Sequence, residues 1–297
     1  MDRTIHYAIT EQENGMTIWQ LLKCRGYSHH ILTHLKNTEM GICVNEVPVY
    51  LNHQLKKAEI LSVFLKEENS SPNIVPVALP ISIVYEDEDL LVVNKPANMP
   101  IHPSMNNHDN TLANAAAYYY ERKKLPFVFR CPNRLDRDTS GLTILAKNML
   151  SSSILSDMVK LRTLKREYLA IVKGIPEPSG TVNAPIARKD GSTIERIVDF
   201  ENGEPAVTHY TRIKTCSNYS LISLSLETGR THQIRVHMRH IGHPLPGDFL
   251  YNPDYSIIQR QALHSHSLTF KHPVTGKPMH FEAPLPEDMA YALQNLS

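Results

Sequence analysis

The stretch CPNRLDRDTSG, residues 131–141, runs directly into the apolar segment Leu142–Ala146, which predicts a strand. A polar loop that feeds a strand holds its side chains rigidly. Asp136 lies between Arg134 and Arg137, and neighbouring guanidinium groups favour the ionised form of a carboxylate. Asp136 is therefore a candidate nucleophile or electrostatic stabiliser. The alternative is an ordinary turn whose Asp and Ser side chains cap backbone amides.

A second candidate segment, LSLETGRTHQIR at residues 224–235, joins a strand to a helix. Alternating apolar and serine residues at 222–226 predict a half-buried strand that ends at a Thr-Gly turn. Apolar residues spaced i, i+4 and i+7 then predict a helix whose inward face carries Ile234, Met238 and Ile241. Another stripe of this helix carries His232, Arg235 and Arg239. Such a stripe either directs cations into a site or is a solvated face.

Short strands and a few helices alternate from about residue 81 to the end, without a regular βαβ order. This pattern predicts an α+β domain with a largely antiparallel or mixed sheet. It includes a strand at Leu90–Val93, a helix at 111–123 capped near Asn110, and a strand around Tyr168, which is either a core residue or part of a site.

The first 66 residues predict a separate small module. Helical apolar spacing covers 17–24 and 28–36, with Ser28 capping the second helix, and short strands are expected at 42–49 and 60–65. The run EENSSP, residues 67–72, is followed by Pro76 and Pro80, which predicts a linker. We therefore expect a module at 1–66, a linker at 67–80 and a larger domain at 81–297.

The charge of the chain is uneven. Its 297 residues are 41% hydrophobic, which is typical of a globular protein, and 31 Lys and Arg against 30 Asp and Glu give a net charge of +1. Residues 130–173 and 230–243 are nevertheless strongly basic, whereas residues 86–89 are all carboxylates. The basic stretches are either phosphate-binding surfaces or solvated faces.

Several classes of protein are disfavoured. No segment approaches the roughly 18 apolar residues of a membrane helix, and the first residues lack the pattern of a secretory signal. Four scattered cysteines without a C-x-x-C pair indicate neither a disulfide framework nor a thiolate metal site. Nucleotide-cofactor, serine-hydrolase and zinc-protease motifs are absent, and the histidines lack suitably spaced carboxylates. We expect a soluble cytoplasmic protein, a monomer, without a membrane contact, metal or cofactor.

Several motifs together resemble one family. Asn133-Arg134-Leu135-Asp136 followed by Asp138-Thr139-Ser140-Gly141-Leu142 is similar to the H-R-L-D-x-x-T-S-G-L motif of the RluA/RluD family of pseudouridine synthases, with Asn133 where histidine is commoner. Further segments agree in order along nearly the whole chain: 85–87, 93–96, 102–104, 167–170, 228–237, 242–245, 247–248, 263–264 and 272–273.

The resemblance implies an RNA-modifying isomerase without a cofactor. In this interpretation Asp136 is the catalytic aspartate, Tyr168 packs against the uracil and assists proton transfer, and Arg235 pairs with Asp136. Arg134 fills the gap left by the extruded nucleotide. The other candidate substrate contacts are Arg137, Thr139, Arg230, His232 and Leu263, and the candidate RNA-backbone contacts of the domain are Lys160, Arg162, Lys165 and Arg166. Ribosomal RNA is the first expected partner and transfer RNA the second.

The N-terminal module resembles the S4 RNA-binding domain, with Ser28 opening the second helix and residues 42–45 closing into strands. Its candidate backbone contacts are Arg25 and His29, although His29 and His30 stand where that domain usually has an arginine. The alternative is a small packing domain without an RNA contact. For the whole chain, the alternatives are a non-catalytic RNA-binding or ribosome-assembly protein and, less favoured, a carboxylate-dependent hydrolase.

Overall fold

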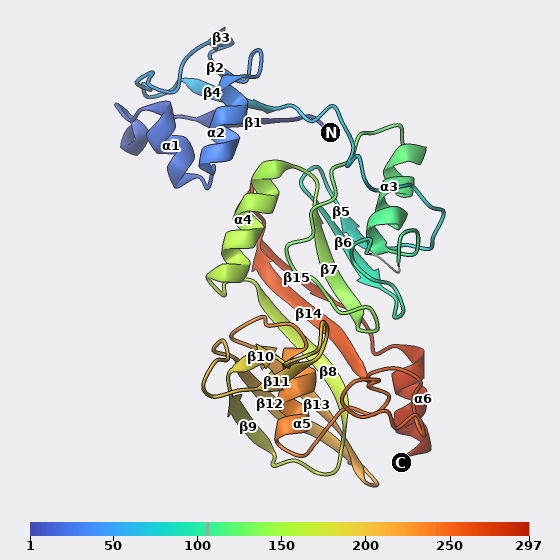
Figure 1. Cartoon of the computed structure of the whole chain (residues 1–297). Coiled ribbons are helices and arrows are strands. Elements are labelled where there is room, and N and C mark those ends of the chain that lie inside the picture. The colour runs from blue at the N-terminus through green and yellow to red at the C-terminus, as the bar shows by residue number, and fades with distance from the viewer. Residues whose placement is uncertain (105–106, 297) are drawn as a thin grey trace.

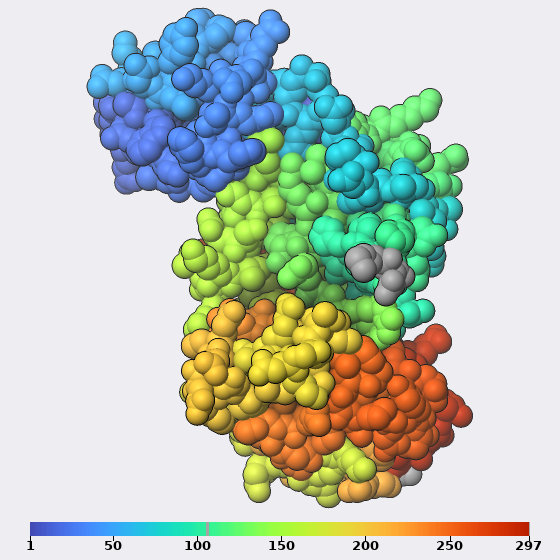
Figure 2. Space-filling model, in the orientation of Figure 1, coloured from blue at the N-terminus to red at the C-terminus, as the bar shows by residue number. Residues whose placement is uncertain are grey.

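The computed structural model describes residues 1–104 and 107–296, which form two units (Figure 1). Figure 2 shows the N-terminal unit, in blue, at one end of the molecule and the C-terminal half, in yellow to red, at the other. Across the described residues, no helix is both long and apolar enough to cross a membrane.

The N-terminal unit packs two α-helices against a four-stranded antiparallel sheet of order β1-β4-β2-β3. Thr17 and Ser28 begin the two helices, because each side chain accepts a hydrogen bond from the backbone amide three residues further on. The elements are β1 (Arg3–Ala8), α1 (Ile18–Cys24), α2 (His29–Lys36), β2 (Ile42–Val44), β3 (Val47–Pro48) and β4 (Ile60–Leu65), with a short 3-10 helix at Glu11–Glu13.

The strand expected at 42–49 is instead a hairpin of β2 and β3. Asn45 and Glu46 both have positive φ angles, 48° and 68°, and two consecutive left-handed residues form the tight turn that matches the twist of paired strands. The strand prediction was wrong there because an apolar pattern does not show where the chain reverses.

The larger unit is built on a nine-stranded sheet of order β5-β6-β7-β14-β8-β13-β12-β9, with β15 beside β14. Its strands are β5 (Ser82–Glu86), β6 (Leu90–Lys95), β7 (Ser140–Ala146), β8 (Lys165–Lys173), β9 (Ser179–Asn183), β12 (Val207–Cys216), β13 (Tyr219–Leu226), β14 (Leu263–Lys271) and β15 (Pro278–Glu282). A separate hairpin contains β10 (Ile186–Arg188) and β11 (Arg196–Val198). The helices are α3 (Leu112–Arg122), α4 (Met149–Lys160), α5 (Gln233–His240) and α6 (Glu287–Asn295).

This architecture confirms the α+β prediction. The recorded pairings of the large sheet are antiparallel except for β7 and β14, which run parallel, so the sheet is mixed. The start of α3 differs by one residue from the expected cap: Thr111, rather than Asn110, accepts the amide of Asn114, and Asn114 in turn accepts the amide of Thr111.

The two units are packed together through α4. Leu150 of α4 is buried within the apolar core of the N-terminal unit, and Ile154 lies so close to Gly26 that a Cβ at that glycine would come within 2.7 Å of it. Arg3 of β1 also binds both oxygens of Asp89, at 3.0 and 3.1 Å. The N-terminal unit is therefore held against the larger unit by apolar and charged contacts.

The segment 67–80, predicted as a linker, contains neither helix nor strand, but it is attached to the larger unit. Glu67 accepts two hydrogen bonds from Arg130 and one from the first amide of α4. Ser70 and Ser71 accept the backbone amides of residues 127 and 129.

Candidate active site

Asp136 lies in a turn just before β7, and the central sheet fixes the position of that turn. The amide of Thr139 donates to the carbonyl of Asp136 at 3.2 Å, which closes the turn. Gly141 then has a φ of 110°, and a Cβ there would lie 2.2 Å from the carbonyl oxygen of Ser265 on β14. Only glycine fits, so the Ser-Gly pair of the motif brings β7 directly against β14.

Buried polar side chains hold the turn from behind. Lys95 is 1% exposed, and its Nζ donates to the carbonyls of Pro96, Met99 and Arg137 at 2.8 to 2.9 Å. Burial lowers the pKa of this lysine to about 7. Gln261 donates through Nε2 to Thr139 Oγ1 at 2.8 Å. The turn is thus anchored at two points near Asp136.

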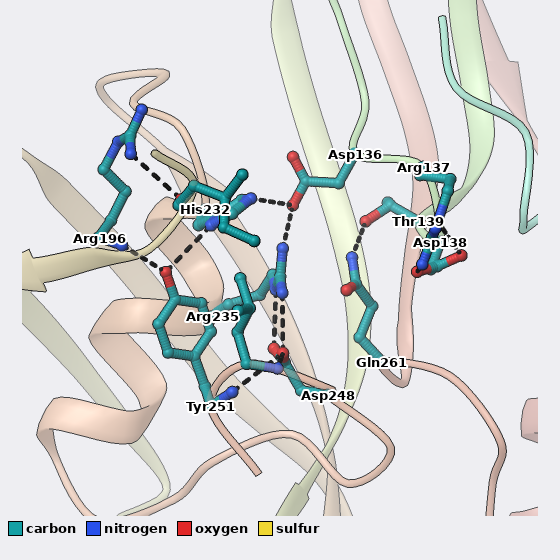
Figure 3. Close-up of polar contacts among 12 residues, drawn as sticks. Asp136, Arg137, Asp138, Thr139, Arg196, His232, Arg235, Asp248, Tyr251 and Gln261 are labelled. Atoms are coloured by element: carbon teal, nitrogen blue, oxygen red, sulfur yellow. Dashed lines mark hydrogen bonds and ion pairs between the residues drawn. The ribbon is translucent and has the colours of Figure 1, made fainter. Parts of the chain in front are cut away.

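Arg235 of α5 joins Asp136 to a second, fully buried carboxylate. Its Nη1 donates to Asp136 Oδ2 at 2.9 Å, while Nε and Nη2 bind the two oxygens of Asp248 at 2.7 and 2.8 Å (Figure 3). Burial opposes the charge of Arg235, but the hydrogen bonds to Asp248 and the charge of Asp136 raise its pKa above the ordinary value. Bidentate pairing with Asp248 therefore fixes the plane of the guanidinium that faces Asp136.

His232 approaches Asp136 from the beginning of α5. Its backbone is left-handed, with a φ of 58°, and its Nε2 lies 3.9 Å from Asp136 Oδ2. Nδ1 lies 3.0 Å from Tyr251 Oη, which also accepts the amide of Arg196 at 2.9 Å. Since Tyr251 Oη accepts that amide, its own proton is free to donate to Nδ1. Burial lowers the pKa of His232, which favours the neutral ring.

The two oxygens of Asp136 have different surroundings. Oδ2 contacts Arg235 and faces His232, whereas Oδ1 accepts no hydrogen bond from any residue that the structure describes. The Asp136 side chain is 28% exposed, so it is reachable from solvent. Oδ1 can therefore contact a bound molecule, while the buried guanidinium of Arg235 balances the charge of the Asp136 carboxylate.

Asp136, His232 and Arg235 line an open pocket of about 70 Å³. Tyr168 of β8 forms part of its wall and is 5% exposed, so it belongs both to the apolar core and to the pocket. The wall and rim bring together these sequence-predicted residues: Arg134, Asp136, Thr139, Arg166, Tyr168, Arg230, His232, Arg235 and Leu263.

Some predicted contacts lie elsewhere. Arg137 is not part of the pocket lining and pairs with Asp138, at 2.9 Å, with a half-exposed side chain. Arg166, expected at the RNA backbone, lies in the pocket wall beside Gly229, because β8 carries it toward the loop before α5. Lys160, Arg162 and Lys165 are exposed outside the pocket lining.

In the N-terminal unit, Arg25 pairs with Glu13 at 2.6 Å and His29 is exposed at the start of α2.

The stripe of α5 that the sequence analysis singled out, His232, Arg235 and Arg239, is not uniformly solvated. Arg235 is buried and His232 is half-buried, whereas Arg239, near the end of the helix, is exposed. The partner Asp248 explains the burial of Arg235. Sequence reasoning assigned no role to Asp248, Tyr251 or Lys95, although the segments Gly247-Asp248 and Asn94-Lys95-Pro96 had already stood out as motifs.

Within the described residues, one group of side chains has the composition of a metal site: Asp87, Asp89 and His272. None of the three lines the pocket at Asp136. His272 Nε2 contacts Asp87 at 2.9 Å, and Asp89 is bound by Arg3 and Asn148. The three side chains are therefore bound to one another or to neighbouring residues, and they form an internal hydrogen-bonded cluster.

Comparisons with known proteins agree with the motif arrangement. Residues 89–240 match the family model of RNA pseudouridylate synthases, a range that contains Asp136, Tyr168 and Arg235. An uncharacterized RNA pseudouridine synthase of Bacillus subtilis, YjbO, is 41% identical over 93% of this chain and 97% of its own length.

A ribosomal large subunit pseudouridine synthase D of Zymomonas mobilis is 45% identical over 72% of both chains. Among solved structures, human RNA pseudouridylate synthase domain containing 1 superposes with a TM-score of 0.59 and 28% identity, over 70% of this chain and 84% of its own.

Proposed function

The chain belongs to the RNA pseudouridylate synthase family and is an isomerase that forms pseudouridine in RNA, and from this premise we propose that its substrate is large-subunit ribosomal RNA. Support for this substrate comes from relatives 40% and 45% identical that are named ribosomal large subunit pseudouridine synthase D. Transfer RNA is the second substrate class to test. We further propose that the protein is a monomer and acts in the cytoplasm, where ribosomal RNA is available to it.

The reaction breaks the N1–C1′ bond of uridine and joins C1′ to C5, while the C5 proton is lost and N1 gains a proton. We assign the catalytic carboxylate to Asp136, and the observation that carries this assignment is its asymmetric environment. Arg235 binds Oδ2 and leaves Oδ1 open to the pocket. A carboxylate held in this way can attack or stabilise an electron-poor centre of the nucleoside without first reorganising.

Tyr168 supplies the wall against which the uracil packs. Its ring is buried in β8, and in the described part of the chain its hydroxyl has no recorded hydrogen-bond partner. The detached uracil must turn within the site without escaping. A fixed aromatic face and the apolar side chain of Leu263 can retain it while water is excluded.

Cations around the pocket fit an extruded nucleotide. Taking a base out of its stack costs a few kcal/mol, and an inserted guanidinium offsets part of that cost by stacking. Arg134 is exposed at the rim and is assigned this role, while Arg166 and Arg230 approach the flanking phosphates.

The N-terminal unit is proposed to bind RNA in the manner of an S4 domain. Its helix α2 begins next to the contact with α4, and His29 and Arg25 are exposed there. Because α4 joins this unit to the domain that carries Asp136, one RNA could contact both units.

Mapping pseudouridines in total RNA, from cells with and without the gene for this chain, tests the proposal. We expect the loss of one or a few pseudouridines from large-subunit ribosomal RNA and their return when the gene is restored. Loss confined to transfer RNA would overturn the substrate assignment. An unchanged map would favour the non-catalytic alternative.

A further inference from the structure

A row of alternating guanidinium groups and aromatic rings passes beside Asp136. Arg137 lies 5.7 Å from the ring centroid of Phe249, Phe249 lies 5.6 Å from Arg235, and Arg235 lies 5.0 Å from Tyr251. All three distances are within the range of cation–π attraction. The row thus links a surface arginine to the guanidinium that binds the catalytic carboxylate.

The two rings of this row are exposed to very different degrees. Tyr251 is 6% exposed and bonded through its hydroxyl, whereas Phe249 is 44% exposed. A single exposed phenylalanine is common and needs no explanation. What distinguishes Phe249 is its place directly after Asp248, beside the ion pair on which the site depends.

Arg137 is also oriented rather than free. Its Nε and Nη2 bind the carboxylate of Asp138, at distances from 2.9 to 3.2 Å, and its side chain remains 47% exposed. A guanidinium plane held by a carboxylate and backed by a ring is a suitable surface for a nucleobase. Arg137 and Phe249 together therefore form a partly exposed platform beside the Asp136–Arg235 contact, outside the lining of the pocket itself.

We propose that this platform stacks on the nucleobase next to the extruded uridine. The inference rests on the proposed function, because extrusion of the target leaves its neighbours without one stacking partner. Arg137 and Phe249 replace that partner, so they determine which neighbouring base is preferred. Since larger ring systems stack more strongly, a purine at this position is favoured over a pyrimidine.

A synthetic stem-loop containing the mapped uridine provides the test, with an abasic residue placed at either neighbouring position. For Phe249→Ala we expect kcat/KM on the intact RNA to fall about 10-fold, mostly through KM. On the RNA that lacks the stacked base, the variant and the wild type should differ by less than twofold. Phe249→Trp should retain activity on the intact RNA.

The control is Phe200→Ala, which removes another exposed phenylalanine that is absent from the pocket lining. It should leave kcat/KM unchanged, and thermal melting should show both alanine variants folded. An equal loss for Phe249→Ala on intact and on both abasic RNAs would show that the ring only supports Arg235, and would overturn the proposal.

A second readout needs no turnover. With 2-aminopurine at the neighbouring position, binding of the wild type should quench its fluorescence, and Phe249→Ala should lose that quenching at saturating protein. Quenching that is the same in both proteins would contradict stacking. Absence of pseudouridine with wild-type protein would instead contradict the proposed function, and the fluorescence result would stand independently.

Discussion

The pocket at Asp136 and the surface of the N-terminal unit hold their arginines in opposite ways. Arg235 has a side chain 2% exposed and is bound on both sides by carboxylates. Arg25 is 47% exposed and pairs with one carboxylate, Glu13. A buried pair keeps one geometry, whereas an exposed arginine can exchange its partner for a phosphate at little cost. The difference supports the proposed division between a region for chemistry and a region for RNA binding.

The largest effect is expected where a buried pair is broken. Asp248→Asn leaves Arg235 buried with only Asp136 as a charged partner, which should lower the free energy of unfolding by about 3–5 kcal/mol. Because Arg235 then loses its fixed plane, kcat/KM should fall about 100-fold or more. Urea unfolding and single-turnover kinetics measure the two effects.

The matched control is Glu204→Gln, which breaks the exposed pair of Glu204 with Arg230. It should cost no more than about 1 kcal/mol of unfolding free energy. If Asp248→Asn were as mild as Glu204→Gln, the contrast between buried and exposed pairs would be wrong.

Replacing Lys95 should have a smaller effect on the free energy of unfolding, and this effect should depend on pH. Burial lowers its pKa to about 7, so between pH 7 and its ordinary value near 10.5 the unfolded chain binds more protons than the folded one. The contribution of Lys95 to the free energy of unfolding therefore increases as pH rises. Relative to Lys95→Met, the wild type should gain about 2 kcal/mol between pH 7 and 9 in urea unfolding.

Lys173→Met, a change at an exposed lysine, is the control for this experiment. The same pH dependence in both variants would mean that Lys95 is not the titrating group.

A still smaller effect is expected in the N-terminal unit. Arg25→Ala and His29→Ala should weaken RNA binding several-fold and leave the single-turnover rate at saturating protein unchanged. The salt dependence of binding should become shallower by about one unit of slope for Arg25→Ala, since one phosphate contact is lost. Glu13→Gln, which releases Arg25, should not weaken binding, and a loss with this variant would contradict the assignment.

No effect is expected from a metal chelator. EDTA should leave pseudouridine formation by the purified protein unchanged, because the proposed reaction uses Asp136 and its neighbours alone. Inhibition that added Zn²⁺ or Mg²⁺ reverses would contradict this account and would direct attention to the cluster of Asp87, Asp89 and His272.

Sequence patterns predicted the parts of this molecule that depend on local chemistry. Ser28 caps α2 because its side chain reaches the amide of Ile31, and this interaction needs only neighbouring residues. The alternation at 222–226 likewise predicted the strand that became β13. The mixed sheet followed from the absence of a βαβ order.

Other features depend on contacts that no local pattern contains. The turn at Asn45 and Glu46 was missed because an apolar run does not mark a chain reversal. The burial of Arg235 could not be predicted, because it depends on a hydrogen bond to Asp248, which lies beyond the end of α5 in the sequence. Phe249 belongs to no periodic pattern, and its position between two guanidinium groups arises only in the folded structure.

In the proposed mechanism, the open oxygen of Asp136 carries the reaction. A single-turnover assay of tritium release from C5 of labelled uridine in one RNA, with purified wild type and Asp136→Asn at saturating protein, tests this role. We expect a loss of at least about 10³-fold in the variant while RNA affinity stays within a few-fold of the wild type. Turnover by the variant within about tenfold of the wild type would show that Asp136 does not carry the reaction.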